Sequence, residues 1–323
     1  MQPSGPRLRE EPIAVAVRPC GAAFFSRHCV WLAWALLVWV SASGAGCPRI
    51  VQQYTQPIPR ALPPTASLQQ VLNVVNDNSA RVQSVSTTRA TIVISGAPTL
   101  TANIAFVRPR SFRMVAQKFI GPEVDLGSND ELLWFWIKHM PSPAMFYCRH
   151  EEFGASAARQ IMPVEPEWLI QAMGVVTFDA GDQIEGPFPV GKGRLEIRSK
   201  SRMPDAGSSR ITIVDDSRGV VLEEHVYDAQ RNRLASAVLS KHQRDPVSGA
   251  TLPHHVEIQW PPANLSLSID MPDLQINQLT SGSNDLFTKP SYSGFNEVDL
   301  AHPNGQLTPN ARGPSGAPPQ ARY

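Results

Sequence analysis

The chain has 323 residues, and its 29 Lys and Arg against 28 Asp and Glu give a formal net charge of +1. Proteins that bind nucleic acid carry clusters of basic residues, so a net charge this close to zero argues against that function. Four cysteines are present. Cys20 and Cys29 fall within residues 1–46, which are interpreted below as a leader, and Cys47 is expected to be acylated, so Cys148 has no partner for an intramolecular disulfide.

The N-terminal segment reads as an export leader. Arg27 and His28 precede the apolar run Val30–Val40, and small residues at 41–46 lead directly into Cys47. A charged flank, a short apolar core and small residues before the cut are typical of a signal peptide. The run is too short for a mature helix across about 30 Å of hydrocarbon, which needs about 20 apolar residues. We expect residues 1–46 to be removed.

The sequence Ala45-Gly46-Cys47 resembles a lipobox, in which the cysteine is lipidated and becomes the first residue of the mature protein. This resemblance implies a bacterial lipoprotein whose lipidation site is Cys47. Two alternatives stay open, which are cleavage by an ordinary signal peptidase and an uncleaved anchor that uses the segment up to Ala45.

Composition divides the rest of the chain into three parts. Residues 47–66 are rich in proline without periodicity, which predicts a semi-extended tether. Residues 281–323 are rich in Pro, Gly, Ser and Asn, which predicts a disordered tail. Between them, residues 67–280 should form one domain.

Two helices are expected in this domain. Leu68, Val71, Leu72 and Val75 follow helical spacing, and Ser67 with Gln70 forms a capping box. A second helix is predicted over 165–173, which holds Trp168, with Pro166 in its first turn and Gly174 at its end.

Eleven segments have the period of two that is typical of strands, or are short apolar runs. They contain the residues Ile92/Ile94, Ile104/Phe106, Phe112/Met114, 132–137, 144–148, Leu195/Ile197, Ile211/Ile213, 220–226, 234–239, 256–260 and 265–269. No regular βαβ alternation is present. The predicted fold is mainly β (α+β), a curved antiparallel incomplete β-barrel of about eleven strands covered by a helical lid.

Two stretches carry a family resemblance. Residues 106–114 (FVRPRSFRM) and 128–137 (SNDELLWFWI) are similar to the LolA/LolB group of periplasmic lipoprotein carriers, with an Arg-Pro turn between aromatic strands and then a Trp-Phe strand. The resemblance extends over about residues 67–280. It implies an apolar cavity that takes up acyl chains of lipids or lipoproteins, and it implies that Arg108 helps to hold the lid closed. The apolar insertion loop of LolB is not identified in the sequence.

The candidate cavity residues are the aromatic and apolar side chains of these segments, namely Phe106, Phe112, Met114, Trp134, Trp136 and Trp168. Trp134 and Trp136 should share one face of their strand, with Phe135 on the other. Packing in an ordinary core is the alternative for these residues, and a strand-end turn is the alternative for Arg108.

No catalytic, metal or cofactor site is predicted. His254, His255 and Glu257 lack further ligands at metal-site spacing, and no GxSxG turn is present. Cys148 has His150 and Arg149 nearby but is expected to be a structural thiol.

The leading hypothesis is a non-enzymatic, exported lipoprotein. We expect it to be anchored in the cell envelope, with the outer membrane as the preferred location, and to face the periplasm. Its expected partners are the membrane, through the anchor, and acyl lipids or lipoproteins. Two alternatives remain, a lipid-sensing or interaction module that resembles RseB and contacts an envelope membrane protein, and a structural envelope lipoprotein without a ligand.

Overall fold

The computed structural model describes residues 57–161, 165, 167–200, 208–279 and 283–302. The chain divides into two units, Met1–Gln53 and Tyr54–Tyr323, and all described residues belong to the second. The predicted leader and its Cys47 lie outside them. Within the described ranges, none of the helices combines the length and the apolar character needed to cross a bilayer.

The domain opens with helix α2 (Leu68–Ala80), as predicted. The Ser67 hydroxyl accepts from the Gln70 backbone N–H, and the Gln70 side chain accepts from the Ser67 backbone N–H, so the capping box is complete. Such reciprocal bonds satisfy two N–H groups that a helix start leaves open. Val71 and Val75 are buried on the face that packs against the sheet.

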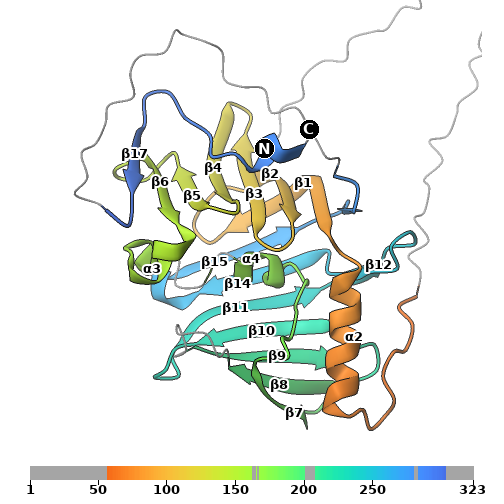
Figure 1. Cartoon of the computed structure of the whole chain (residues 1–323). Helices are drawn as coiled ribbons and strands as arrows, with labels where there is room; N and C mark the ends of the chain where they lie inside the picture. The colour runs from red at the N-terminus through yellow and green to blue at the C-terminus, as the bar shows by residue number, and fades with distance from the viewer. Residues whose placement is uncertain (1–56, 162–164, 166, 201–207, 280–282, 303–323) are drawn as a thin grey trace, which may run out of the picture. The chain divides into compact units, whose positions relative to one another are not determined.

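Nearly all described strands join one sheet (Figure 1). Their order is β17-β6-β5-β4-β3-β2-β1-β15-β14-β11-β10-β9-β8-β7, with β16 paired to β1. All pairs are antiparallel except β17 with β6. The chain therefore runs from β1 outward to β6 along one half of the sheet. It continues at the opposite edge with β7 and runs inward to β15, which pairs with β1 at the centre. This is the predicted incomplete barrel with helices over it.

The strand bounds are β1 (Ser84–Ile94), β2 (Leu100–Val107), β3 (Ser111–Lys118), β4 (Gly121–Ser128), β5 (Leu132–Ile137), β6 (Ala144–Arg149), β7 (Gln183–Pro189), β8 (Arg194–Lys200), β9 (Ser209–Asp215), β10 (Val221–Tyr227), β11 (Arg233–Ser240), β14 (His255–Trp260), β15 (Leu265–Asp270), β16 (Gln275–Ile276) and β17 (Asn296–Asp299). Strands β12 (Gln243–Arg244) and β13 (Thr251–Leu252) form a separate small hairpin.

Short helices fill the connections. The segment between β6 and β7 contains a 3-10 helix, η1 (His150–Ala155), then α3 (Ala158–Ile161) and α4 (Glu167–Ala172). Two further 3-10 helices are η2 (Pro261–Ala263) and η3 (Ser283–Phe287). Helix α4 falls within the predicted 165–173, and Gly174 follows it at a φ of +93°.

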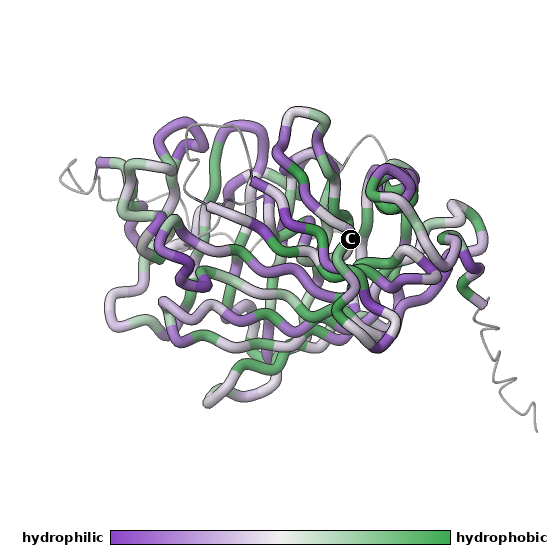
Figure 2. Tube along the Cα trace, turned by 90° about the horizontal axis from the view of Figure 1, so that it is seen from below, coloured by the Kyte–Doolittle hydropathy of each residue, from purple (hydrophilic) through white to green (hydrophobic). Residues whose placement is uncertain are grey.

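Apolar and polar residues alternate along many of the strands (Figure 2), and successive side chains of a strand point to opposite faces of the sheet. Three buried clusters result. An interior cluster covers the strands from β1 to β6 and from β10 to β15 and includes α4. A second cluster joins α2 to β8, β9 and β10 through Ile197, Val214 and Val221. The third, called here the outer tryptophan cluster, consists of Trp134, Trp136 and Met145 with Tyr292 and Phe295 packed against them.

The domain is longer than the sequence predicts. Residues 283–302, called here the C-terminal strap, contain η3 and β17, and β17 pairs with β6, so the expectation of disorder from 281 is wrong for this stretch. The physical reason is that Tyr292, Phe295 and Leu300 are anchors that bury apolar area, although the intervening residues are polar.

The predicted tether also ends earlier than expected. Leu62 is buried beside Val71, and the backbone N–H groups of Ala61 and Leu62 both donate to the Ser217 carbonyl oxygen. Residues 60–66 thus belong in part to the domain.

Candidate functional site

The interior cluster brings together three of the predicted cavity residues. Phe106 of β2, Phe112 of β3 and Trp168 of α4 are 0–4% exposed, and Met114 packs against the same cluster. Their strands are neighbours, with Phe106 opposite Phe112 in the β2·β3 register. The sequence therefore places paired aromatic residues of β2 and β3 in the same buried cluster as α4.

Helix α4 packs within this cluster, next to β11. Its side chains Trp168, Leu169, Ile170 and Ala172 are buried, and the Trp168 ring lies 6.4 Å from that of Trp260. A six-residue helix is too short to be stable alone, so its position depends on these contacts. The Nε1 atoms of both tryptophans are buried without a hydrogen-bond partner among the described residues.

One turn connects the sheet to both covering helices. Arg108 and Arg110 flank Pro109 between β2 and β3. The Arg108 Nη1 donates to the Ser79 carbonyl oxygen in the last turn of α2, at 2.9 Å, and the Arg110 Nε lies 3.0 Å from the Glu167 Oε1 in the first turn of α4. A cation is favourable at a helix C-terminus and an acid at an N-terminus, so both contacts suit the helix dipoles.

Arg108 is thus placed where it holds a covering helix, and Arg110 is a contact that sequence reasoning missed. The signal was present, because Arg110 belongs to the same Arg-Pro-Arg turn.

The inner face also carries a buried acid. Glu224 of β10 is 0% exposed, and its only ion pair within the described chain is with the Arg210 Nε at 3.1 Å. Burial raises the pKa of Glu224, and the nearby positive charge of Arg210 opposes that rise. Its strand neighbour Thr212 has a buried hydroxyl without a described partner.

Trp134 and Trp136 do not join the other four candidates. Alternation along β5 places Leu133 and Phe135 in the interior cluster and both tryptophans in the outer tryptophan cluster. Trp136 stacks on Tyr292 at 4.2 Å and meets the edge of Phe295 at 5.2 Å. The C-terminal strap therefore covers these rings, which lie on the opposite face of the sheet from Phe106 and Phe112.

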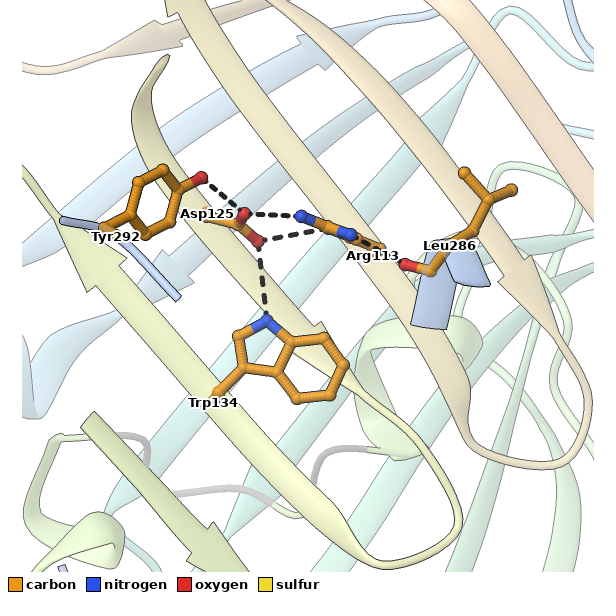
Figure 3. A network of polar contacts seen from close by, with 5 residues as sticks. All are labelled: Arg113, Asp125, Trp134, Leu286 and Tyr292. Atoms are coloured by element: carbon orange, nitrogen blue, oxygen red, sulfur yellow. Dashed lines mark hydrogen bonds and ion pairs between the residues drawn. The ribbon is translucent and has the colours of Figure 1, made fainter. Parts of the chain in front are cut away.

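A polar network fixes the strap to the sheet (Figure 3). The Asp125 carboxylate is fully buried and accepts from the Arg113 Nη2 at 2.8 Å, the Tyr292 hydroxyl at 2.7 Å and the Trp134 Nε1 at 3.4 Å. The Arg113 Nη1 also donates to the Leu286 carbonyl oxygen at 3.0 Å. A buried carboxylate is stable when its lone pairs are satisfied in this way.

The turn between β3 and β4 exposes two large apolar side chains. Phe119 and Ile120 are 110% and 92% exposed at the tip of this hairpin, directly after Lys118. Exposed single apolar residues are common, but two adjacent ones on a projecting turn favour contact with another apolar phase. This tip was not identified from the sequence.

The thiol and the paired histidines have structural surroundings. Burial raises the pKa of the Cys148 thiol, whose Sγ lies 3.4 Å from the Ser156 Oγ. The His255 Nδ1 lies 2.9 Å from the Asp270 Oδ1 on the neighbouring strand. One group of three possible metal ligands occurs in the described ranges, formed by Glu152, Asp299 and His302.

No family model matches the sequence. No curated protein matches it either. Among solved structures, it is similar to a domain from Vibrio parahaemolyticus assigned to outer membrane lipoprotein sorting, with 10% identity, 68% of this chain and 99% of that chain covered, and a TM-score of 0.46.

Two further structures have similar scores. One is a LolA superfamily protein from Nitrosomonas europaea, with 8% identity, 68% and 97% coverage and a TM-score of 0.42. The other is a DUF1329 family protein from Desulfovibrio piger, with 11% identity, 67% and 99% coverage and a TM-score of 0.43.

Proposed function

We propose that this chain is a non-catalytic cell-envelope lipoprotein that binds acyl chains of lipids or lipoproteins between the sheet and its covering helices. The observation that carries the proposal is the apolar interior beneath α4, with one Arg-Pro-Arg turn contacting both α2 and α4. Phe106, Phe112 and Met114 line the binding site, and Trp168 occupies it until an acyl chain takes its place. Lipidation of Cys47 would hold it at the outer membrane, facing the periplasm.

The interior is filled by α4, so an acyl chain must replace the side chains of that helix. Burial of Trp168 stabilises by about 4–6 kcal/mol, and Leu169 and Ile170 each add about 1.5–3 kcal/mol. A sixteen-carbon acyl chain offers about 12 kcal/mol before entropic costs. Burial of the three α4 side chains and burial of the acyl chain therefore contribute similar gross free energies. Reversible loading and release of the acyl chain require such a balance.

Contact with the bilayer would come from the Phe119-Ile120 tip. Insertion of both side chains contributes about 3–6 kcal/mol by the same measure of buried apolar area. A neighbouring Lys118 suits an interface with anionic lipids. The tip and a lipid anchor together provide the two signals that stable membrane attachment needs.

The test is lipid extraction and uptake of a fluorescent fatty acid by the full chain, compared with an Arg108→Gln/Arg110→Gln variant. We expect bound acyl lipid in the purified protein and faster uptake by the variant, because both helix contacts are lost. The control is Arg198→Gln, which removes a pair with Glu196 elsewhere on the sheet, with side chains that are 56% and 16% exposed.

The filled core favours one competing function, a structural envelope lipoprotein without a ligand, since Trp168 is only 2% exposed. A folded variant that takes up no lipid even after both arginine contacts are removed would establish this competitor and refute the proposal.

A further inference from the structure

A second pocket lies outside the interior, at the C-terminal end of α2. It has a volume of about 240 Å³, and its walls come from residues 58–61, the end of α2, the β9–β10 turn and the β12–β13 hairpin. Three arginines line it, Arg81, Arg218 and Arg244, against one acidic residue, Asp77. We propose that this pocket, called here the arginine pocket, binds a phosphate group.

Two of the guanidinium groups are close together. A Cβ atom placed on Gly249 would lie 3.1 Å from the Arg244 Nη2 and 3.2 Å from the Arg81 Nη1. The two nitrogens are therefore no more than about 6.3 Å apart, the sum of these distances. Like charges at this separation repel each other, and an anion between them removes the repulsion.

None of the three guanidinium groups forms an ion pair within 4 Å in the described chain, although the charges of Asp215 and Arg218 attract each other. Arg81 donates to the Gly249 carbonyl oxygen at 3.0 Å, a neutral acceptor that fixes its direction. Acidic residues of the β9–β10 turn and of the β12–β13 hairpin accept hydrogen bonds from the backbone of their own turns. Asp215 accepts from the backbone N–H groups of Ser217 and Arg218, and Asp245 from those of Val247 and Ser248.

The chemistry of the pocket favours phosphate over a carboxylate. One arginine is enough to bind both oxygens of a carboxylate, whereas a phosphate offers oxygens in several directions and suits several guanidinium groups at about 2.7–2.9 Å. Arg244 is half-buried, and Arg81 and Arg218 are exposed, so the site is open to a ligand from solvent or from a membrane surface.

Two sources of phosphate fit this location. Ile58 in the pocket wall is eleven residues after Cys47, a length of chain that spans at most about 36–40 Å. If Cys47 is lipidated, as proposed above, lipid headgroups are within reach of the pocket. Free phosphate is the other source and does not depend on the anchor.

The experiment measures binding of inorganic phosphate and of glycerophosphoglycerol to the full chain by calorimetry. Glycerophosphoglycerol carries the headgroup without acyl chains, so the result is independent of lipid binding in the interior. We expect Arg244→Gln to weaken binding about tenfold, which corresponds to the loss of one charge-assisted hydrogen bond. Tighter binding of glycerophosphoglycerol would identify a lipid headgroup, and tighter binding of inorganic phosphate a free anion.

The matched control is Arg233→Gln, which removes an exposed positive charge from the start of β11, at the far end of β10 from the pocket. It should change the affinity less than twofold. Absence of binding by both probes, or an equal loss in the control, would overturn the proposal. Unchanged melting temperatures of both variants would exclude misfolding as the cause.

Discussion

Individual side chains on the two faces of β4 and β5 show how tightly the sheet is built. Gly127 lies opposite Trp134 in the register, and the indole ring occupies the space where a Cβ would be. A Cβ at Gly127 would lie 2.2 Å from the Trp134 ring, whereas none of the described atoms lies within 4 Å of a Cβ at Gly181. Gly127 is therefore required by packing.

We predict that Gly127→Ala lowers the free energy of unfolding by about 1–3 kcal/mol, the usual effect of overpacking. The melting temperature should fall by about 2–4 °C for each kcal/mol in a domain of this size. Gly181→Ala is the control and should show no loss. Equal melting temperatures for the two variants in thermal denaturation would contradict the close contact.

Glu224 gives a prediction about pH. Because burial raises its pKa in the folded state, the folded protein holds this proton more tightly than the unfolded chain does. The contribution of Glu224 to stability is then complete below its ordinary pKa and is lost as the pH rises through the raised value. Glu224→Gln removes this dependence.

Chemical denaturation at several pH values between about 5 and 8 should show the wild type losing stability relative to Glu224→Gln. Using the difference between the two proteins cancels the opposite trend from acids with lowered pKa values, such as Asp215 and Asp270. A difference that stays constant over this range would mean that Glu224 is ionised throughout.

At the scale of elements, the covering helix α4 is the part that the geometry marks as displaceable. Its ion pair, Arg110 with Glu167, has side chains that are 36% and 27% exposed. Pairs this exposed contribute at most about 1 kcal/mol, so the contact biases the position of α4 without fixing it.

We expect Arg110→Gln to raise amide hydrogen exchange in α4 by about two- to fivefold, the effect of losing up to about 1 kcal/mol of local stability. Exchange in β10 and β11 should stay unchanged. Exchange that rises equally throughout the domain would indicate global destabilisation and would count against a separately mobile helix.

The hairpin tip is the second such element. Replacing both Phe119 and Ile120 by Ser should reduce the association of the full chain with lipid vesicles, since these side chains bury no area within the domain. Val247→Ser is the control, because Val247 is 90% exposed on a different hairpin. Loss of vesicle association in both variants would show a general effect of surface hydrophobicity.

Several elements could be predicted from the sequence because their signals are local. The capping box of α2, the alternation in β1, β2 and β3, and the apolar run of β5 predicted the right structure at the right place. Strand β4 was missed since Glu123 and Asp125 give it a polar pattern, and both are buried only because distant basic residues pair with them.

The same reason limited the prediction of the site. Periodicity separates Trp134 from Phe135 but cannot tell which face is the interior, and the partner of Trp136 lies far along the chain at Tyr292. The arginine pocket is built from four segments that only the fold brings together.

At the scale of the whole molecule, the C-terminal strap decides where the folding unit ends. It covers Trp136 and Met145, supplies Tyr292 to the buried Asp125, and donates from the Leu300 backbone N–H to the Tyr147 carbonyl oxygen. A chain that ends at 280 would expose these groups.

We predict that truncation after residue 302 leaves a soluble domain with native tryptophan fluorescence, and that truncation after residue 280 gives a protein that aggregates. Exposure of Trp136 should move its emission to longer wavelength in any soluble fraction of the shorter protein. A stable monomer from the shorter chain would show that the strap is an accessory segment.

The parallel pairing of β17 with β6 also changes what the sheet offers to other molecules. A long sheet with bare outer strands invites copies of itself to add by main-chain bonding, and fibres can follow. Here one outer strand is only four residues long, and the opposite one, β7, contains Pro187 and Pro189, which have no N–H to donate. The domain can therefore stay at high concentration without polymerising through its edges.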